Sequence, residues 1–168
     1  MGKIKSHQKL PTEWNEREIL RDKGQFWTTS WIADAMVSYV AENTDLVFDP
    51  ATGRGAFYEA LLKLKKPKVS FFGTDIDNEV LEDEIYNHKN CFVEERDFIK
   101  NPPQRKFKAI VANPPYIRHH RIDEETKNLL KQLSVSITGD TIDGRAGYHI
   151  YFLIQALNLL EQDGKLLS

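Results

Sequence analysis

The sequence has only one cysteine, Cys91, among its 168 residues, so no internal disulfide can form. It also lacks any apolar run that approaches the roughly 20 residues of a membrane-spanning helix. Its first residues, Met1–Lys5, are polar, and no apolar segment follows them. These absences exclude a membrane protein and a secreted, disulfide-stapled domain, and they favour a reducing, cytoplasmic environment.

The sequence has no large excess of charge of either sign, because 23 Lys and Arg stand against 25 Asp and Glu, for a net charge of -2. It therefore lacks the strongly basic signature of a dedicated nucleic-acid-binding domain, and any contact with DNA is expected to be local. Basic residues do gather over residues 63–68 and 118–121. The histidines show no metal-ligand spacing with acidic residues or with Cys91, so we expect no metal.

Short apolar runs alternate with helical patterns, and hydrophobic residues make up 40% of the chain, which is enough for one globular core. This alternation predicts an α/β fold with a doubly wound, mostly parallel sheet. Residues 1–24 carry no core pattern and are interpreted as a polar N-terminal arm. The expected strands cover residues 46–48, 69–73, 91–93 and 108–112, with a fifth starting at 165; the expected helices cover 31–40, 57–64, 78–87, 123–133 and 148–160, with a loop over 134–147.

Polar side chains stand at the ends of four expected strands. They are Asp49, Asp75, Asp97 and Asn113. Ligands of open parallel sheets bind outside the carboxyl ends of the strands. This edge of the sheet is therefore the predicted binding site.

The turn after the first strand contains Gly53 and Gly55, which let the backbone approach a ligand closely, and the next helix offers free N–H groups. Asp75 follows Gly55 by 20 residues, where a carboxylate can accept both hydroxyls of a ribose. Two ordinary strand-to-helix turns would give the same pattern. If the pattern is functional, it predicts an adenosine-bearing cofactor, without separating NAD from S-adenosylmethionine. Tyr58 replaces the third glycine of the nicotinamide fingerprint, which disfavours a dehydrogenase.

The segment Asn113-Pro114-Pro115-Tyr116 directly follows the fourth expected strand. An amino group on an aromatic ring is a poor nucleophile because its lone pair is delocalised, so its methylation needs acceptors for both N–H bonds. The side-chain oxygen of Asn113 and the carbonyl of Pro114 are two such acceptors, and the prolines preset the backbone direction. Tyr116 offers a ring on which a planar substrate can stack. A sulfonium carries its own leaving group, so this reaction needs positioning rather than a metal.

Five segments in one order resemble the amino-directed DNA methyltransferases, specifically the adenine-specific ones whose cofactor-binding half precedes the catalytic motif. These segments are Gly24–Thr29, Phe48–Gly55, Gly73–Asp77, Arg96–Phe98 and Asn113–Ile117. The resemblance implies a Rossmann-like S-adenosylmethionine-dependent methyltransferase fold. It also implies methyl transfer from S-adenosylmethionine to the exocyclic amino group of adenine in double-stranded DNA, in a bacterial restriction–modification system. A restriction endonuclease or a specificity domain or subunit is the implied partner.

The resemblance assigns roles residue by residue. The catalytic residues are Asn113, Pro114, Pro115 and Tyr116, which would hold the target base. At the amino-acid end of S-adenosylmethionine, the resemblance places Thr28, Pro50, Ala51, Gly53 and Gly55, with Asp49 near the ammonium group or a bridging water. It places Asp75 on the ribose, and Ile76, Asp97 and Phe98 around the adenine of the cofactor. The candidate DNA contacts are Arg118, His119, His120 and Arg121. These residues either contact DNA phosphates or form a solvated basic turn.

Two departures from the family shape the expectation for the whole chain. The segment Thr28-Thr29-Ser30 lacks the proline that usually follows the first threonine, which leaves open which hydroxyl touches the cofactor. The family's fold also continues past a fifth strand and normally adds a target-recognition domain. We therefore expect residues 25–168 to be a partial catalytic domain, truncated after the start of the fifth strand. The alternatives are methylation of a protein glutamine amide or an RNA base, and a module that binds cofactor or DNA without catalysis.

Overall fold

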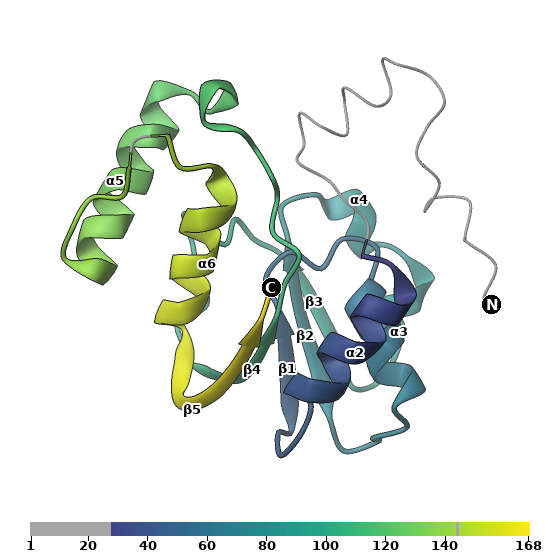
Figure 1. Ribbon diagram of the computed structural model, residues 1–168. Coiled ribbons are helices and arrows are strands. Elements are labelled where there is room, and N and C mark those ends of the chain that lie inside the picture. Colours follow the sequence, from purple (N-terminus) through teal and green to yellow (C-terminus); the bar gives the residue numbers. More distant parts are fainter. Residues whose placement is uncertain (1–27, 144) are drawn as a thin grey trace.

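The computed structural model describes residues 28–143 and 145–168 (Figure 1). The predicted arm, residues 1–24, and the part of the first motif over residues 24–27 lie outside the described residues. The other segments of the resemblance lie within them.

Within the described residues, the sheet has five strands, all parallel, in the order β3-β2-β1-β4-β5. These are β1 (Leu46–Asp49), β2 (Ser70–Asp75), β3 (Cys91–Glu95), β4 (Phe107–Val111) and β5 (Leu160–Leu167). The chain first winds outward from β1 to β3 and then crosses to the other side of β1 with β4 and β5. The winding direction therefore reverses between β1 and β4, which is where doubly wound sheets bind their ligands. The predicted fold class is confirmed.

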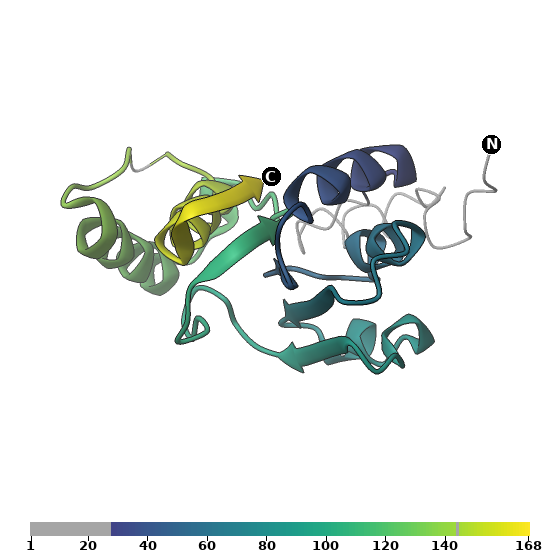
Figure 2. The same cartoon turned by 90° about the horizontal axis from the view of Figure 1, so that it is seen from below.

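Helices cover both faces of this sheet. They are α2 (Ser30–Val40) and α3 (Ala56–Lys63) on one face, α5 (Glu124–Thr138) and α6 (Tyr148–Asn158) on the other, α4 (Asn78–Leu81) after β2, and the 3-10 turns Glu84–Tyr86 and His119–Arg121. Figures 1 and 2 show α2 beside α3 and α5 beside α6. Within the described ranges, no helix combines the length and apolarity that crossing a membrane requires.

The alternation of side chains along β1 divides the core into two layers. Val47 packs with α2 and α3, whereas Phe48 packs with α6 on the opposite face. Successive strand residues point to opposite faces, so one buried strand serves both layers. The Phe48 ring stacks on Phe107 with 4.1 Å between centroids and on Phe72 with 5.2 Å. This aromatic stack joins β2, β1 and β4 directly beneath the edge that carries the predicted site.

Helix α5 is longer than predicted. The serine and threonine content of residues 134–147 suggested a loop, yet the helix runs on to Thr138. The Ser134 hydroxyl donates to the carbonyl of Lys131, and the Thr138 hydroxyl donates to that of Ser134, so both groups are satisfied within the helix. Gly139, with a φ of 81°, then ends the helix in the left-handed conformation.

Two other element boundaries differ from the prediction. The helix expected over 78–87 ends at Leu81 and is followed by the 3-10 turn, because Asp83 caps a new start by accepting from the Ile85 N–H at 3.1 Å. Strand β5 starts at Leu160 rather than 165. Its pairing jumps from Phe107–Leu160 to Ala109–Lys165, so residues 161–164 bulge out of the ladder.

The buried face of α2 is also not the one that the sequence pattern predicted. The apolar spacing over residues 31–40 predicts Trp31 in the core, but its side chain is 72% exposed, and the helix instead buries Ala33, Val37 and Val40. Smaller side chains let α2 lie close to the sheet and to α3. The apolar run over residues 91–93 predicts a buried Cys91, but this residue is half-buried because β3 is an edge strand.

We expect Phe48→Ala to lower the free energy of unfolding by about 3–5 kcal/mol, because a completely buried ring is lost from the centre of the stack. Phe92→Ala is the matched control, since this strand phenylalanine is 59% exposed and its loss is expected to cost less than about 1 kcal/mol. Urea unfolding followed by circular dichroism measures both. Equal losses would contradict the two-layer core.

Candidate active site

The carboxyl ends of the parallel strands lie along one edge of the sheet (Figure 1), and the predicted polar residues stand at or just after these ends. Asp49 ends β1, Asp75 ends β2, and Asp97 follows the end of β3. Asn113 follows β4, the strand that neighbours β1 on its other side. The structure thus places the glycine turn between the acidic residue of β2 and the Asn-Pro-Pro-Tyr segment.

The turn after β1 depends on glycine for two different reasons. Gly53 has a φ of 50°, and no atom of the described residues beyond its chain neighbours lies within 4 Å of the place where a Cβ would stand. Gly55 has a φ of 76°, and a Cβ there would lie 3.0 Å from Ile85 and 3.2 Å from the Tyr86 hydroxyl. Gly53 therefore faces open space at the site, whereas Gly55 packs the turn against the 3-10 turn that carries Tyr86.

Asp75 ties the turn after β1 to the end of β2. Its Oδ2 accepts the Gly53 N–H at 2.8 Å, and its Oδ1 accepts the Asp77 N–H at 3.0 Å. Burial raises the pKa of this carboxyl, and these backbone hydrogen bonds counteract part of that rise. Each oxygen of a carboxylate has two acceptor sites, so Asp75 can hold the turn and still accept from a ligand.

Asp49 lies beneath the turn and is completely buried. Its Oδ1 accepts the Ala51 N–H at 3.1 Å, while its buried Oδ2 accepts no hydrogen bond from any described residue. Burial holds the pKa of this carboxyl well above its usual range, and the neighbouring charge of Asp75 adds to the effect. A buried oxygen without a partner marks either a strained site or a place for a missing donor.

Tyr86 supports the glycine turn from behind, and the sequence analysis missed it. Its hydroxyl donates to the Gly53 carbonyl at 2.7 Å and lies 3.1 Å from the Thr52 hydroxyl. Burial raises the pKa of this hydroxyl, so it stays protonated and remains a donor. No local motif marks this residue, because 33 positions separate it from Gly53.

The three residues predicted around the cofactor adenine lie in different surroundings. Ile76 is 69% exposed and projects from the end of β2. Asp97 caps its own turn by accepting the N–H groups of Ile99 at 3.0 Å and Lys100 at 3.1 Å. Phe98 is buried against Phe152, with 4.7 Å between ring centroids. Their contacts with a cofactor stay predictions.

The Asn-Pro-Pro-Tyr segment meets two parts of the chain that sequence reasoning did not connect to it. The Asn113 amide nitrogen donates to the Thr28 hydroxyl at 3.1 Å. The Tyr116 ring stacks on His149, with 5.0 Å between centroids and 30° between planes. Gly147 makes room for that imidazole, because a Cβ there would lie 2.8 Å from it. The apolar periodicity of the sequence carries no information on a contact between Tyr116 and a histidine on α6.

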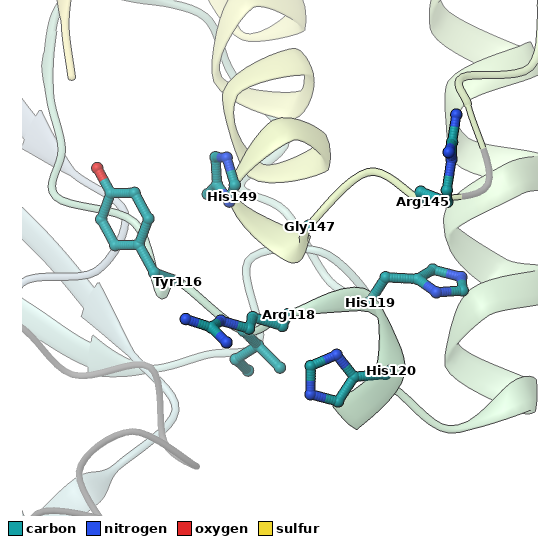
Figure 3. Close-up of a pocket in the computed structure, with 8 residues that line it drawn as sticks. Tyr116, Arg118, His119, His120, Arg145, Gly147 and His149 are labelled. Carbon is teal, nitrogen blue, oxygen red and sulfur yellow. The ribbon is translucent and has the colours of Figure 1, made fainter.

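A cavity of about 740 Å³ opens beside Tyr116 and His149 (Figure 3). Its wall includes three of the four predicted DNA contacts, Arg118, His119 and His120. It also includes a second arginine, Arg145, which the sequence did not indicate. Arg145 pairs with Asp143 at 3.2 Å. Arg121 is on the same 3-10 turn but does not line the cavity. Among the residues that the structure describes, no cluster of His, Cys, Asp and Glu is suited to hold a metal ion.

The parallel sheet, the glycine turn after β1 and the acid that ends β2 define a class of protein. A putative class I S-adenosylmethionine-dependent methyltransferase from Listeria monocytogenes shares the fold, with a TM-score of 0.57 over 82% of this chain and 43% of that chain at 17% identity. The chain has the fold of S-adenosylmethionine-dependent methyltransferases, and S-adenosylmethionine is the cofactor that this fold implies.

Residues 49–168 match the model of the Eco57I restriction-modification methylase family, and the chain belongs to that family. It is 29% identical to the type II methyltransferase M.AccI of Acinetobacter calcoaceticus, over 84% of this chain and 26% of the relative. It is 27% identical to M.HincII of Haemophilus influenzae, over 86% of this chain and 27% of the relative. The chain spans about a quarter of the length of these curated relatives. The predicted membership in a restriction–modification methyltransferase family is confirmed.

The buried carboxyl of Asp49 predicts how stability depends on pH. Its folded-state pKa lies above its unfolded value of about 3.9, so the folded state holds more protons between these two values. The free energy of unfolding therefore falls as the pH rises through this interval. Asp49→Asn is expected to reduce this fall, and Asp75, whose pKa is also raised, accounts for the remainder.

Urea unfolding across the range from about pH 3 to pH 8 checks the effect of Asp49→Asn. Asp123→Asn is the control, because hydrogen bonds from Thr126 lower the pKa of that exposed carboxyl, which gives its contribution the opposite sign. The control is expected to keep the wild-type fall. An unchanged pH profile in Asp49→Asn would show that its carboxyl is not the titrating group.

Proposed function

We propose that this chain carries the cofactor-binding and catalytic residues of an enzyme that methylates the exocyclic amino group of adenine in double-stranded DNA, within a restriction–modification system. One observation carries the proposal. Asn113 follows β4 at the point where the winding reverses, beside the glycine turn of β1 and on the same sheet edge as Asp75. Membership in the Eco57I restriction-modification methylase family supports the reaction class.

The residues at this edge fit the implied cofactor. Asp75 presents a partly buried carboxylate suited to ribose hydroxyls, and the open side of Gly53 leaves the backbone accessible. The buried Oδ2 of Asp49, which has no described hydrogen-bond partner, lies in the strand end beneath the proposed place of the cofactor's amino-acid end and is available to a donor there. When bound, S-adenosylmethionine supplies a methyl group on a sulfonium that is its own leaving group.

The Asn-Pro-Pro-Tyr segment has the groups that an aromatic amine needs. We assign the side-chain oxygen of Asn113 and the backbone carbonyl of Pro114 as acceptors for the two N–H bonds of the target amino group. Accepting these bonds turns the nitrogen lone pair out of the ring plane and toward the methyl group. Pro114 is buried and Pro115 half-buried, so the direction of the carbonyl is fixed by packing as well as by ring geometry.

The cavity beside Tyr116 is the proposed face for the target strand. The Tyr116 ring is 44% exposed and offers a surface for an extruded base. Arg118, His119 and His120 line the cavity next to it and provide donors for phosphate oxygens. Arg121 remains a predicted phosphate contact outside the cavity. The grouping of these hydrogen-bond donors within one cavity favours DNA binding over a solvated basic turn.

Asp75→Asn is expected to weaken binding of S-adenosylhomocysteine to this chain by about 10–100-fold, because hydrogen bonds to a charged acceptor contribute about 1.5–3 kcal/mol. Calorimetric titration measures the affinity, with NADH as the negative control ligand. Asp123→Asn is the matched variant, since Asp123 also caps a backbone N–H, that of Thr126 at 2.8 Å, but stands at the start of α5, outside the proposed cofactor residues. Binding of NADH alone would overturn the cofactor assignment. Binding of neither ligand would leave this chain without a working cofactor site.

Asn113→Ala is expected to abolish methyl transfer while the affinity for S-adenosylhomocysteine changes less than about 2-fold, because the residue holds the target and not the cofactor. The test uses the longest form of the protein that carries these residues and radiolabelled S-adenosylmethionine. Digestion of the labelled product should yield N6-methyldeoxyadenosine. Label in glutamine or in ribonucleosides would identify the alternative substrates. Loss of cofactor binding along with transfer would remove Asn113 from the proposed role.

A further inference from the structure

Thr28 and Asn113 are joined by a hydrogen bond across 85 positions of the sequence. The Asn113 amide nitrogen donates to the Thr28 hydroxyl oxygen at 3.1 Å, in a partly buried setting. Thr28 stands just before α2, whereas Asn113 stands just after β4. The resemblance assigns Thr28 to the cofactor, but the contact links it to the residue proposed to hold the target base.

Both partners of this bond are attached to rigid parts of the fold. The carbonyl of Thr29, the residue after Thr28, accepts from the Ile32 N–H at 3.1 Å and from the Ala33 N–H at 3.0 Å. Ala33 is completely buried and anchors the start of α2 in the core. On the other side, the Ala112 N–H donates to the Leu167 carbonyl at 2.9 Å, which fixes the chain immediately before Asn113. The hydrogen bond therefore connects two well-held backbones.

A planar amide held at its nitrogen has the direction of its oxygen fixed as well. With Nδ2 on the Thr28 hydroxyl, the Oδ1 of Asn113 points away from Thr28 and is the end that can accept from a substrate. An amide that turns freely would present its NH₂ end half of the time, and that end repels another amino group. Restraining the rotation therefore matters for the proposed chemistry.

We propose that Thr28 is a positioning residue that orients the Asn113 amide for the target amino group. This inference rests on the proposed function, because it concerns the orientation of the acceptor on which methyl transfer depends. Thr28 acts through Asn113 and is not itself required to touch the target. Removing its hydroxyl leaves the acceptor present but misdirected, so the rate of transfer should fall while binding of the cofactor persists.

Thr28→Val tests the inference because valine keeps the shape of threonine and removes the hydroxyl. We expect kcat to fall by about 10–100-fold, the scale on which misplacement of a reacting group acts, with an S-adenosylhomocysteine affinity within about 2-fold of wild type. Thr28→Ser restores the hydroxyl and should recover most of the rate. Thr44→Val is the matched control, because Thr44 is also half-buried and its hydroxyl also makes a hydrogen bond, to the Leu46 carbonyl at 2.9 Å, but it precedes β1 at the opposite end of that strand from the site.

The outcomes separate the two proposals. Weaker binding of S-adenosylhomocysteine with an unchanged kcat in Thr28→Val would return Thr28 to the cofactor and overturn the inference. A wild-type kcat in that variant, or a failure of Thr28→Ser to recover it, would overturn it too. Urea midpoints check folding, and Thr28→Ala repeats the test if Thr28→Val is destabilised. Full activity of Asn113→Ala would instead refute the proposed function itself, whatever the Thr28 variants show.

Discussion

The parallel direction of all five strands is the constraint on which the rest of this structure depends. It sends the carboxyl end of every strand to one edge of the sheet, so residues far apart in the sequence meet there without any long-range motif. The reversal of winding adds the second condition, because it makes β4 the neighbour of β1. The glycine turn consequently lies between Asp75 and Asn113. A different strand order would keep every motif and separate the cofactor residues from the catalytic segment.

The edge is rigid because buried polar groups hold the turn from several directions. The Thr74 hydroxyl donates to the Pro50 carbonyl at 3.1 Å, and the Thr52 N–H donates to the Thr74 carbonyl at 2.9 Å. Tyr86 and Asp75 hold the Gly53 carbonyl and N–H. Burying each of these hydroxyl and carboxyl groups costs desolvation free energy. The burial of the aromatic stack around Phe48, the residue before Asp49, offsets this cost. Asp49 is the exception, since one of its buried oxygens has no described partner. Local strain of this kind concentrates at functional sites.

The sequence was most informative where the signal is local. Strand ends such as Asp49 and Asp75, and the order of the strands and helices, follow from short patterns read along the chain. Trp31 was misplaced because apolar periodicity identifies an amphipathic helix without saying how closely the helix can approach a sheet. The extension of α5 was missed because serine hydroxyls that usually favour loops can bond to carbonyls of their own helix. His149 and its contact with Tyr116 depend on tertiary packing, for which one sequence carries no signal.

The contact between Tyr116 and His149 limits how a planar substrate can meet this site. A base inserted between two rings separates their centroids by about 7 Å, twice the van der Waals distance of about 3.5 Å. The observed separation of 5.0 Å leaves no room for such an insertion. His149 therefore covers one face of Tyr116 and fixes the plane of its ring, with Gly147 providing the space for the imidazole. A base can then stack only from the opposite side, so any second ring that sandwiches it must come from an element other than α6.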